Sequence, residues 1–114
     1  MCMALNLYHE GLKTEPIEGL FAIAQVVLNR AARKPSKVCD VVYEPHQFSW
    51  TAKPPPVVPG KPWNRARTVA WLAFHMNDFT GGADHYHASY AKPYWRKGMK
   101  RLGQWGSHVF YRSK

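Results

Sequence analysis

Apolar side chains recur every three to four residues along the segment from about residue 16 to residue 33. This spacing puts them on one face of an α-helix. Pro16 suits a first helical position, and Arg33 and Lys34 suit the negative end of the helix dipole. The pattern therefore predicts an amphipathic helix over 16–33, with Ile17, Leu20, Phe21, Ala24, Val27 and Ala31 on its apolar face.

Three further helices are predicted. The first covers residues 2–10 and is stopped by Gly11, so that Glu10 falls at a helix end. In the second, Ser36 is placed to cap a short helix through 38–42. The third runs from about 63 to 79. The apolar positions behind these predictions are Ala4, Leu5, Leu7, Tyr8, Val38, Val41, Val42, Ala66, Val69, Ala70, Ala73 and Phe74.

Alternation with a period of two predicts strands in the second half of the chain. Residues 83–88 and 107–112 both alternate and are expected to pair antiparallel. A short strand is predicted over 47–50, whereas 93–104 has apolar side chains at near-helical spacing and 52–62 is a proline-rich loop. Helices first and a small antiparallel sheet later predict an α+β fold.

Composition sets bounds on what this fold can be. With 114 residues and 46% hydrophobic content, the chain is long enough for one domain with its own core. The net charge is +9, and residues 58–114 carry ten Lys/Arg against only two acids. This asymmetry favours an anionic partner, such as nucleic acid, a membrane surface or an acidic wall polymer. The chain lacks a signal-peptide pattern and a membrane-spanning apolar run, so we expect the product to stay in the cytoplasm.

Cys2 and Cys39 are the only cysteines. The simplest interpretation is two free thiols packed as small hydrophobic side chains. The alternative is a Cys2–Cys39 disulfide, which would require that the protein meet an oxidising compartment after synthesis.

Glu10 is the strongest candidate for acid–base chemistry. Most of the other acidic residues sit at the ends of predicted helices, but Glu10 lies beside Tyr8 and an apolar helix face. Burial there would raise its pKa, as a general acid working at neutral pH requires. A rival reading is a metal site, because His85 and His87 project to one side of a strand, and further ligands could come from His108, Asp84 or a cysteine. No glycine loop for phosphates and no nucleophile elbow is present.

Several segments together resemble the SleB-type cell-wall hydrolase family, which includes spore cortex-lytic enzymes and small phage endolysins. The resembling pieces are residues 4–10, residues 15–30, Val38-Cys39-Asp40-Val41-Val42-Tyr43, Gln47-Phe48-Ser49, Thr80-Gly81-Gly82-Ala83 with Tyr86, and 106–112. Between Glu10 and Glu15 this chain departs from the family pattern: an arginine is missing and one residue is inserted.

The resemblance implies a lysozyme-like, mainly helical α+β domain that cleaves the β-1,4 bond between muramic acid and glucosamine in peptidoglycan. Glu10 matches the catalytic acid of the family. A hydrolase needs a second carboxylate, for which Glu15 and Glu18 are candidates, whereas a lytic transglycosylase manages with one. In an acid-poor chain the transglycosylase route is favoured. We expect Phe48, Tyr86, His87, His108 and His85 to line the glycan groove, with no metal and no cofactor.

Other readings stay open at this point. A hydrolytic muramidase would use the same groove, and a zinc-dependent amidase would use His85, His87 and His108. A basic nucleic-acid-binding module is the non-enzyme alternative, although no recognition-helix pattern supports it. On the favoured reading, residues 1–114 form one catalytic domain without a separate wall-binding domain, and the basic second half contacts anionic envelope polymer. A phage lysin of this kind would wait in the host cytoplasm for a holin and then act on the cell wall.

Overall fold

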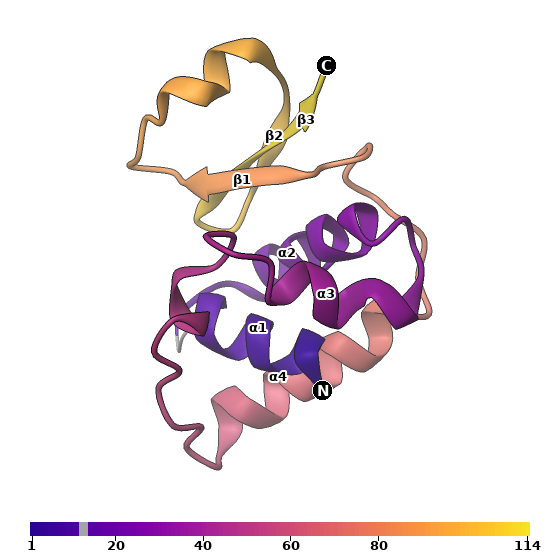
Figure 1. Ribbon diagram of the computed structural model, residues 1–114, viewed down its shortest axis with the longest axis vertical. Helices are drawn as coiled ribbons and strands as arrows, with labels where there is room; N and C mark the ends of the chain where they lie inside the picture. Colours follow the sequence, from indigo (N-terminus) through magenta and orange to yellow (C-terminus); the bar gives the residue numbers. More distant parts are fainter. Residues whose placement is uncertain (12–13) are drawn as a thin grey trace.

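The computed structural model describes residues 1–11 and 14–114, and within them a helical layer lies against a small sheet (Figure 1). The helices are α1 (Cys2–Gly11), α2 (Ile17–Arg30), α3 (Val38–Val42) and α4 (Lys61–Ala73), with short 3-10 helices η1 (Pro35–Lys37), η2 (Ser49–Thr51) and η3 (Tyr94–Gly98). The strands are β1 (His85–Ala88), β2 (Met99–Trp105) and β3 (His108–Ser113). The α+β prediction is confirmed. Among the described residues, no helix is long and apolar enough to cross a bilayer.

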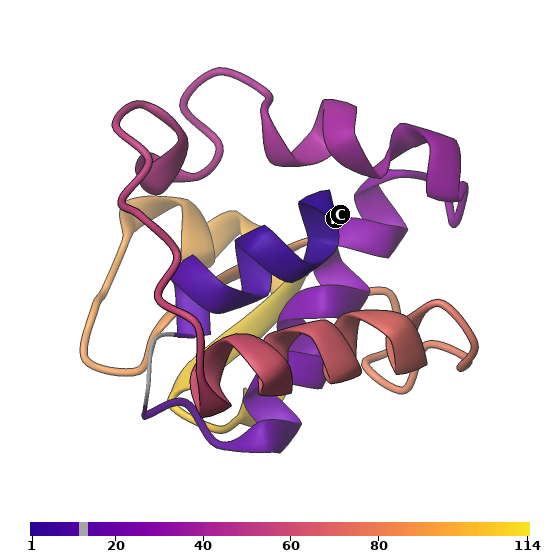
Figure 2. The ribbon, with the colours of Figure 1, turned by 90° about the horizontal axis from the view of Figure 1, so that it is seen from below.

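Helix α2 is the centre of the helical layer. Its residues from Leu20 to Leu28 are almost all buried, apart from Phe21, which is half-buried. Helices α1 and α4 lie side by side next to it (Figure 2). The helix ends at Arg30, three residues before the predicted end, because Ala32 and Arg33 adopt left-handed backbone conformations with φ of 54° and 61°.

The sheet is antiparallel with the order β1-β3-β2, so β3 is the central strand. The predicted pairing of 83–88 with 107–112 is confirmed, with Tyr86 opposite Phe110. Phe110 is fully buried and inserts between the sheet and the helices. Tyr86 lies on the same face of the sheet, and its ring contacts Phe110 at 5.4 Å between ring centroids. This pairing therefore turns Tyr86 toward the helical layer.

In two segments tertiary contacts decide a structure that the local sequence pattern does not indicate. Residues 47–50 form no strand. Instead, Trp50 is buried and its indole Nε1 donates to the side-chain oxygen of Asn6 on α1, at 2.8 Å. The helical spacing in 93–104 also misleads, since only 94–98 forms a 3-10 helix and 99–105 is strand β2. Pairing with the full length of β3 outweighs the helical periodicity there.

Helix boundaries differ from prediction at two further places. The short helix over 38–42 is confirmed, but Ser36 lies inside η1 and no side chain caps α3. The helix predicted over 63–79 begins at Lys61 and ends at Ala73. Beyond it, the Asp78 carboxylate accepts hydrogen bonds from the Thr80 and Gly82 backbone amides, which builds a turn instead of another helical turn.

The free-thiol prediction is wrong. Cys2 and Cys39 form a disulfide that joins the first residue of α1 to α3 across 37 positions of sequence. The spacing alone could not reveal this pairing, because only the packing of α1 against α3 brings the two Cα atoms to 5.3 Å. The bond lies at the opposite end of α1 from Glu10.

Candidate active site

Two hollows in the surface meet at Glu10. The first has a volume of about 420 Å³ and is lined by Glu10, Val26, Arg30, His46, Gln47, Phe48, Asp84, His85, Tyr86, Trp95 and Met99. The second, of about 530 Å³, is lined by Glu10, His46, Gln47, Phe48, Ser49, Thr51 and Ala52. Glu10 thus stands where a chain-like ligand could cross from one hollow to the other. We call the Glu10 helix and residues 46–52 the helical wall, and residues 84–86 with Trp95 and Met99 the sheet wall.

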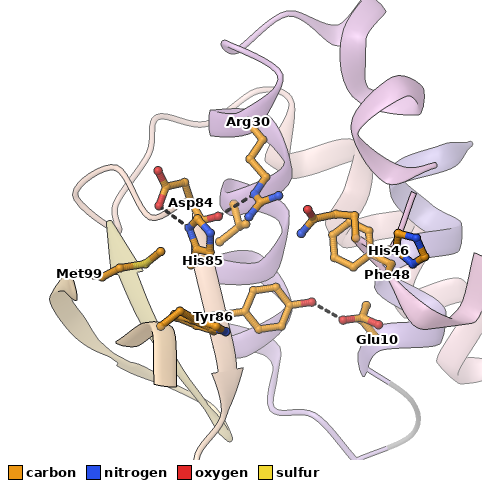
Figure 3. A pocket seen from close by; sticks show the side chains of 11 residues that line it. Glu10, Arg30, His46, Phe48, Asp84, His85, Tyr86 and Met99 are labelled. Carbon is orange, nitrogen blue, oxygen red and sulfur yellow. Dashed lines mark hydrogen bonds and ion pairs between the residues drawn. The ribbon is translucent and has the colours of Figure 1, made fainter. Parts of the chain in front are cut away.

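Glu10 reaches the cleft because it occupies the last turn of α1. The next residue, Gly11, is buried, and a Cβ there would lie 2.3 Å from the Leu20 side chain, so only glycine lets α1 end this close to α2. Across the cleft, the Tyr86 hydroxyl donates a hydrogen bond to Oε1 of Glu10 (Figure 3). The two walls are therefore joined at the carboxyl group itself.

The pKa of Glu10 is raised, as the sequence argument expected. Burial is the largest cause, and it outweighs the hydrogen bond from Tyr86 and the positive charge at His108, which both act to lower the pKa. Burial, followed by the negative charge of Glu10, raises the pKa of Tyr86 well above its usual value, so this phenol stays protonated as a donor. Burial thus favours the protonated form of Glu10, and the Tyr86 hydroxyl can stabilise the carboxylate once the proton is given up.

Glu15 does not face the cleft. Its side chain is only 2% exposed and accepts hydrogen bonds from the Ser107 amide at 2.9 Å, from the Ser107 hydroxyl at 2.7 Å and from Nδ1 of His108 at 2.9 Å. A Cβ on Gly19 or Gly106 would meet its carboxylate within 2.8 Å, so both positions leave room for it. Glu15 therefore clamps the β2–β3 turn against the start of α2.

His108 links Glu15 to Tyr86, because it contacts both residues. Its ring packs edge-on against Tyr86, with 5.2 Å between the ring centroids. It does not line either hollow. Its contact with Glu15 and Tyr86 places it behind the cleft, where it supports the tyrosine that holds Glu10.

Of the other predicted site residues, three lie at the cleft and two do not. Phe48 is buried under both hollows, and Tyr86 and His85 line the first one. His87 lines neither hollow, and its Nε2 is 2.9 Å from the Tyr111 hydroxyl. Glu18 is exposed on the first turn of α2 and lines neither hollow. The contacts of these residues with a glycan stay predictions.

The histidines do not converge on a metal site. His87 packs against Tyr111 and Trp95 on one face of the sheet, whereas His108 packs against Tyr86 on the other. Within residues 1–11 and 14–114, no group of three His, Cys, Asp or Glu side chains is arranged to hold an ion. The three histidines of the amidase reading are therefore not brought together.

Sequence reasoning missed Arg30, Gln47 and Asp84 as cleft residues. Arg30 was not predicted to line the groove, yet its Nε donates to the Asp84 carbonyl at 2.6 Å and its side chain lines the first hollow. The Asp84 carboxylate turns toward His85 and away from Glu10 (Figure 3). Its pKa is lowered, because the hydrogen bonds from His85 and Ser113 together outweigh its burial. The available signal was the position of Arg30 within the segment 15–30 that carries the family resemblance.

Comparison with known proteins agrees with this geometry. Residues 14–111 match the cell wall hydrolase family. Glu10 lies just ahead of this segment, so its assignment rests on the geometry of the cleft. The one-residue insertion expected between Glu10 and Glu15 involves residues 12–13, which lie outside the described residues.

Three relatives share most of this chain. A spore cortex-lytic enzyme of Oceanobacillus iheyensis is 33% identical over 115 residues, which cover 95% of this chain but only 39% of that enzyme. The catalytic domain of the Bacillus cereus SleB protein superposes with a TM-score of 0.75 at 27% identity, over 97% of this chain and 88% of that domain. The catalytic domain of the germination-specific lytic transglycosylase SleB from Bacillus anthracis gives 0.76 at 29% identity, over 97% and 91%.

Proposed function

The chain belongs to the cell wall hydrolase family, and from this premise we propose that it is a lytic transglycosylase that cuts the muramic acid–glucosamine β-1,4 bond of peptidoglycan. One observation carries the proposal. Glu10 stands alone between two hollows with a raised pKa, and no second carboxylate of the described residues turns toward it. The similarity to a structure titled as a lytic transglycosylase supports the same reaction.

In the first step, protonated Glu10 gives its proton to the glycosidic oxygen as the bond to C1 of the muramic acid breaks. Burial raises the pKa of Glu10, which favours the protonated form that this step requires. The Tyr86 hydroxyl occupies Oε1, so Oε2 is the oxygen that faces the leaving group. After the transfer, the Tyr86 bond stabilises the new carboxylate.

In the second step, the C6 hydroxyl of the same muramic acid attacks C1. Its proton passes to the Glu10 carboxylate, which thereby returns to the acid form. The new O6–C1 bond closes a 1,6-anhydro ring, and no water is consumed. One carboxylate that acts first as acid and then as base is sufficient for this sequence.

A hydrolytic mechanism would need a second carboxylate about 5–9.5 Å from the first, depending on stereochemistry. The candidates named from sequence do not fit that role. Glu15 is enclosed by Ser107 and His108, and Glu18 points to solvent. Asp84 lines the first hollow, but its two oxygens are bound by His85 and Ser113. This arrangement supports the single-glutamate route.

The charge distribution supports attraction to an anionic wall polymer. Residues 85–114, which form the sheet and its connections, contain seven Lys/Arg and no acidic residue. Such a surface would concentrate the protein on teichoic-acid-like or carboxylate-rich polymers and would do so less strongly at high salt. The role as a phage endolysin with holin-assisted release remains a prediction from the family resemblance.

Mass spectrometry of digested peptidoglycan tests the reaction. We expect fragments that end in 1,6-anhydromuramic acid, each 18 mass units lighter than its hydrolysed counterpart, and we expect no such fragments from Glu10→Gln. Reducing muramic ends would show hydrolysis and overturn the transglycosylase proposal. Cleaved stem peptides with intact glycan would show an amidase instead.

A further inference from the structure

Arg30 is the one lysine or arginine among the described residues that line the first hollow. It comes from the last residue of α2, so its backbone is held by the most buried helix of the fold. Its Nε donates to the Asp84 carbonyl at 2.6 Å. No hydrogen bond between described residues uses its two terminal nitrogens, so four N–H donors of the guanidinium remain for a ligand.

The guanidinium is directed into the cavity, between Asp84 and the side lined by His46 and Phe48 (Figure 3). The side chain is half-buried, and burial lowers the pKa of Arg30, although the Asp84 and Glu44 carboxylates act against this. An arginine stays protonated despite such a shift. A cation that has lost part of its water gains most from an anion with two oxygens, which pairs with both terminal nitrogens.

Neither neighbouring carboxylate, Asp84 or Glu44, forms a two-oxygen pair with the Arg30 guanidinium in the described part of the chain. Both oxygens of Asp84 are engaged by His85 and Ser113, with Ser113 Oγ at 2.5 Å. Glu44 is exposed and does not line the hollow. The Gln47 side chain lines the same hollow and adds a neutral amide that can donate a further hydrogen bond. The hollow is thus equipped to receive a carboxylate close to Glu10.

We propose that Arg30 binds a carboxylate carried by the muramoyl residue of the substrate, and this inference rests on the proposed function. The sugar rings of peptidoglycan offer neutral hydroxyl and acetamido groups. The negative charges belong to the muramoyl residue, as carboxylates of the attached stem peptide or, where no stem is attached, as its free lactyl carboxylate. Arg30 therefore places muramic acid in the first hollow and the leaving glucosamine toward the second. It defines which of the two alternating β-1,4 bonds is presented to Glu10.

The test is a binding cycle in the Glu10→Gln background, so that no chemistry intervenes. Kd is measured for soluble glycan–peptide oligomers and for the same oligomers after their carboxylates are converted to methylamides. We expect methylamidation to weaken binding about ten- to hundredfold. Adding Arg30→Gln should weaken binding of the native oligomer by a similar factor and leave almost no further effect of methylamidation.

Two results would overturn the inference. If Glu10→Gln binds native and methylamidated oligomers with the same Kd, no substrate carboxylate is recognised. Equal losses from Arg30→Gln on native and methylamidated oligomers would show a structural role only. Arg67→Gln, which removes an exposed arginine of α4 outside both hollows, is the matched control and should preserve the full response to methylamidation.

The source of the carboxylate follows from a second substrate pair. Hydrolysis of the amide that joins the stem peptide frees the lactyl carboxylate, which is absent from peptide-bearing muramic acid. A response to methylamidation on this stripped glycan shows that Arg30 binds the lactyl carboxylate of stem-free muramic acid, and a response confined to peptide-bearing oligomers identifies the carboxylates of the stem. Failure of the proposed function would appear elsewhere, in the end groups of the products, because these Kd values do not depend on which bond is cut.

Discussion

The helical wall of the cleft is held by buried apolar side chains and a disulfide, whereas the sheet wall is held by backbone pairing and an aromatic cluster. The helical wall supplies the carboxyl of Glu10, the proposed acid, and the sheet wall supplies Tyr86, whose hydroxyl donates a hydrogen bond to it. Charge is distributed unevenly along the chain as well: residues 1–84 carry nine Lys/Arg and seven acids, whereas residues 85–114, which include most of the sheet wall, carry seven Lys/Arg and no acid. On the proposed function, Glu10 supplies the chemistry and residues 85–114 supply the attraction to an anionic polymer.

Glu15 lies at the junction between the helical layer and the sheet. It connects the two regions, because it precedes α2 and binds the β2–β3 turn through Ser107 and His108. A buried carboxylate with several donors is stable only while both regions stay in register. On the proposed function, Glu10 and Glu15 therefore have opposite requirements: Glu10 must exchange a proton, whereas Glu15 must keep its charge paired.

The largest expected effect is on the helical wall. Glu10→Gln should lower the rate of glycan cleavage by about 10²- to 10⁴-fold, because the amide can neither give nor take the proton. The measurement is the initial rate of fragment release from purified peptidoglycan. Glu18→Gln, exposed at the start of α2, is the control and should retain the full rate. Full activity in Glu10→Gln would show that another residue is the general acid.

The disulfide gives the next effect, on stability. Reduction of Cys2–Cys39 opens a loop of 37 residues and should cost about 4 kcal/mol, or roughly 20 °C in Tm. Cys39 is exposed, so a mild reductant can reach the bond. Hydrogen exchange should rise in α1, α3 and the helical wall before it rises in the sheet. A Tm that does not respond to reductant would refute this, and the Cys2→Ser/Cys39→Ser variant should show no response.

Glu15→Gln tests the link between the walls. The amide cannot serve as acceptor to all its present donors, and we expect a loss of roughly 2–3 kcal/mol in the free energy of unfolding. Urea unfolding measures it, with Glu18→Gln as the matched surface change. Cleavage should also slow, because His108 no longer holds Tyr86 in place. A stability within 0.5 kcal/mol of the parent would contradict the clamp.

Tyr86→Phe removes the sheet wall's contact with Glu10 and should lower kcat by about tenfold. It also has a defined effect on pH dependence. As an acid, Glu10 works only while protonated, so activity falls as pH rises through its pKa. The hydrogen bond from Tyr86 lowers that pKa, so its removal raises it and moves the falling limb of the kcat profile to higher pH. A limb that moves to lower pH would count against Glu10 as the acid.

The smallest effect concerns the basic surface of the sheet. Replacing Lys97, Lys100 and Arg101 by glutamine should reduce activity on intact walls a few-fold at low salt and flatten the decline with added salt. The same number of changes in the helical layer, at Lys34, Lys37 and Lys53, should leave the salt response intact. Equal responses of the two triple variants would mean that net charge alone matters.

Much of this architecture could be predicted from the sequence. The periodicity of α2, the pairing of β1 with β3 and the position of Glu10 at a helix end follow from local patterns, because side-chain spacing fixes which face is buried. The strand predicted over 47–50 does not form, and most of 93–104, where the spacing is near-helical, lies in strand β2. In both places the structure depends on a partner distant in sequence: Trp50 donates a hydrogen bond to Asn6, and β2 pairs with β3.

The sequence by itself determined an α+β domain, an amphipathic central helix, a charge gathered in the second half and one well-placed glutamate. Only the tertiary structure decided how the other polar groups are used. It buried Glu15 against His108 and placed His87 within hydrogen-bond distance of Tyr111. It also joined Cys2 to Cys39 by a disulfide and placed Arg30 in the lining of the cleft. The physical reason is that a side chain's spacing depends on its own element, whereas its burial and its hydrogen-bond partners depend on elements dozens of residues away.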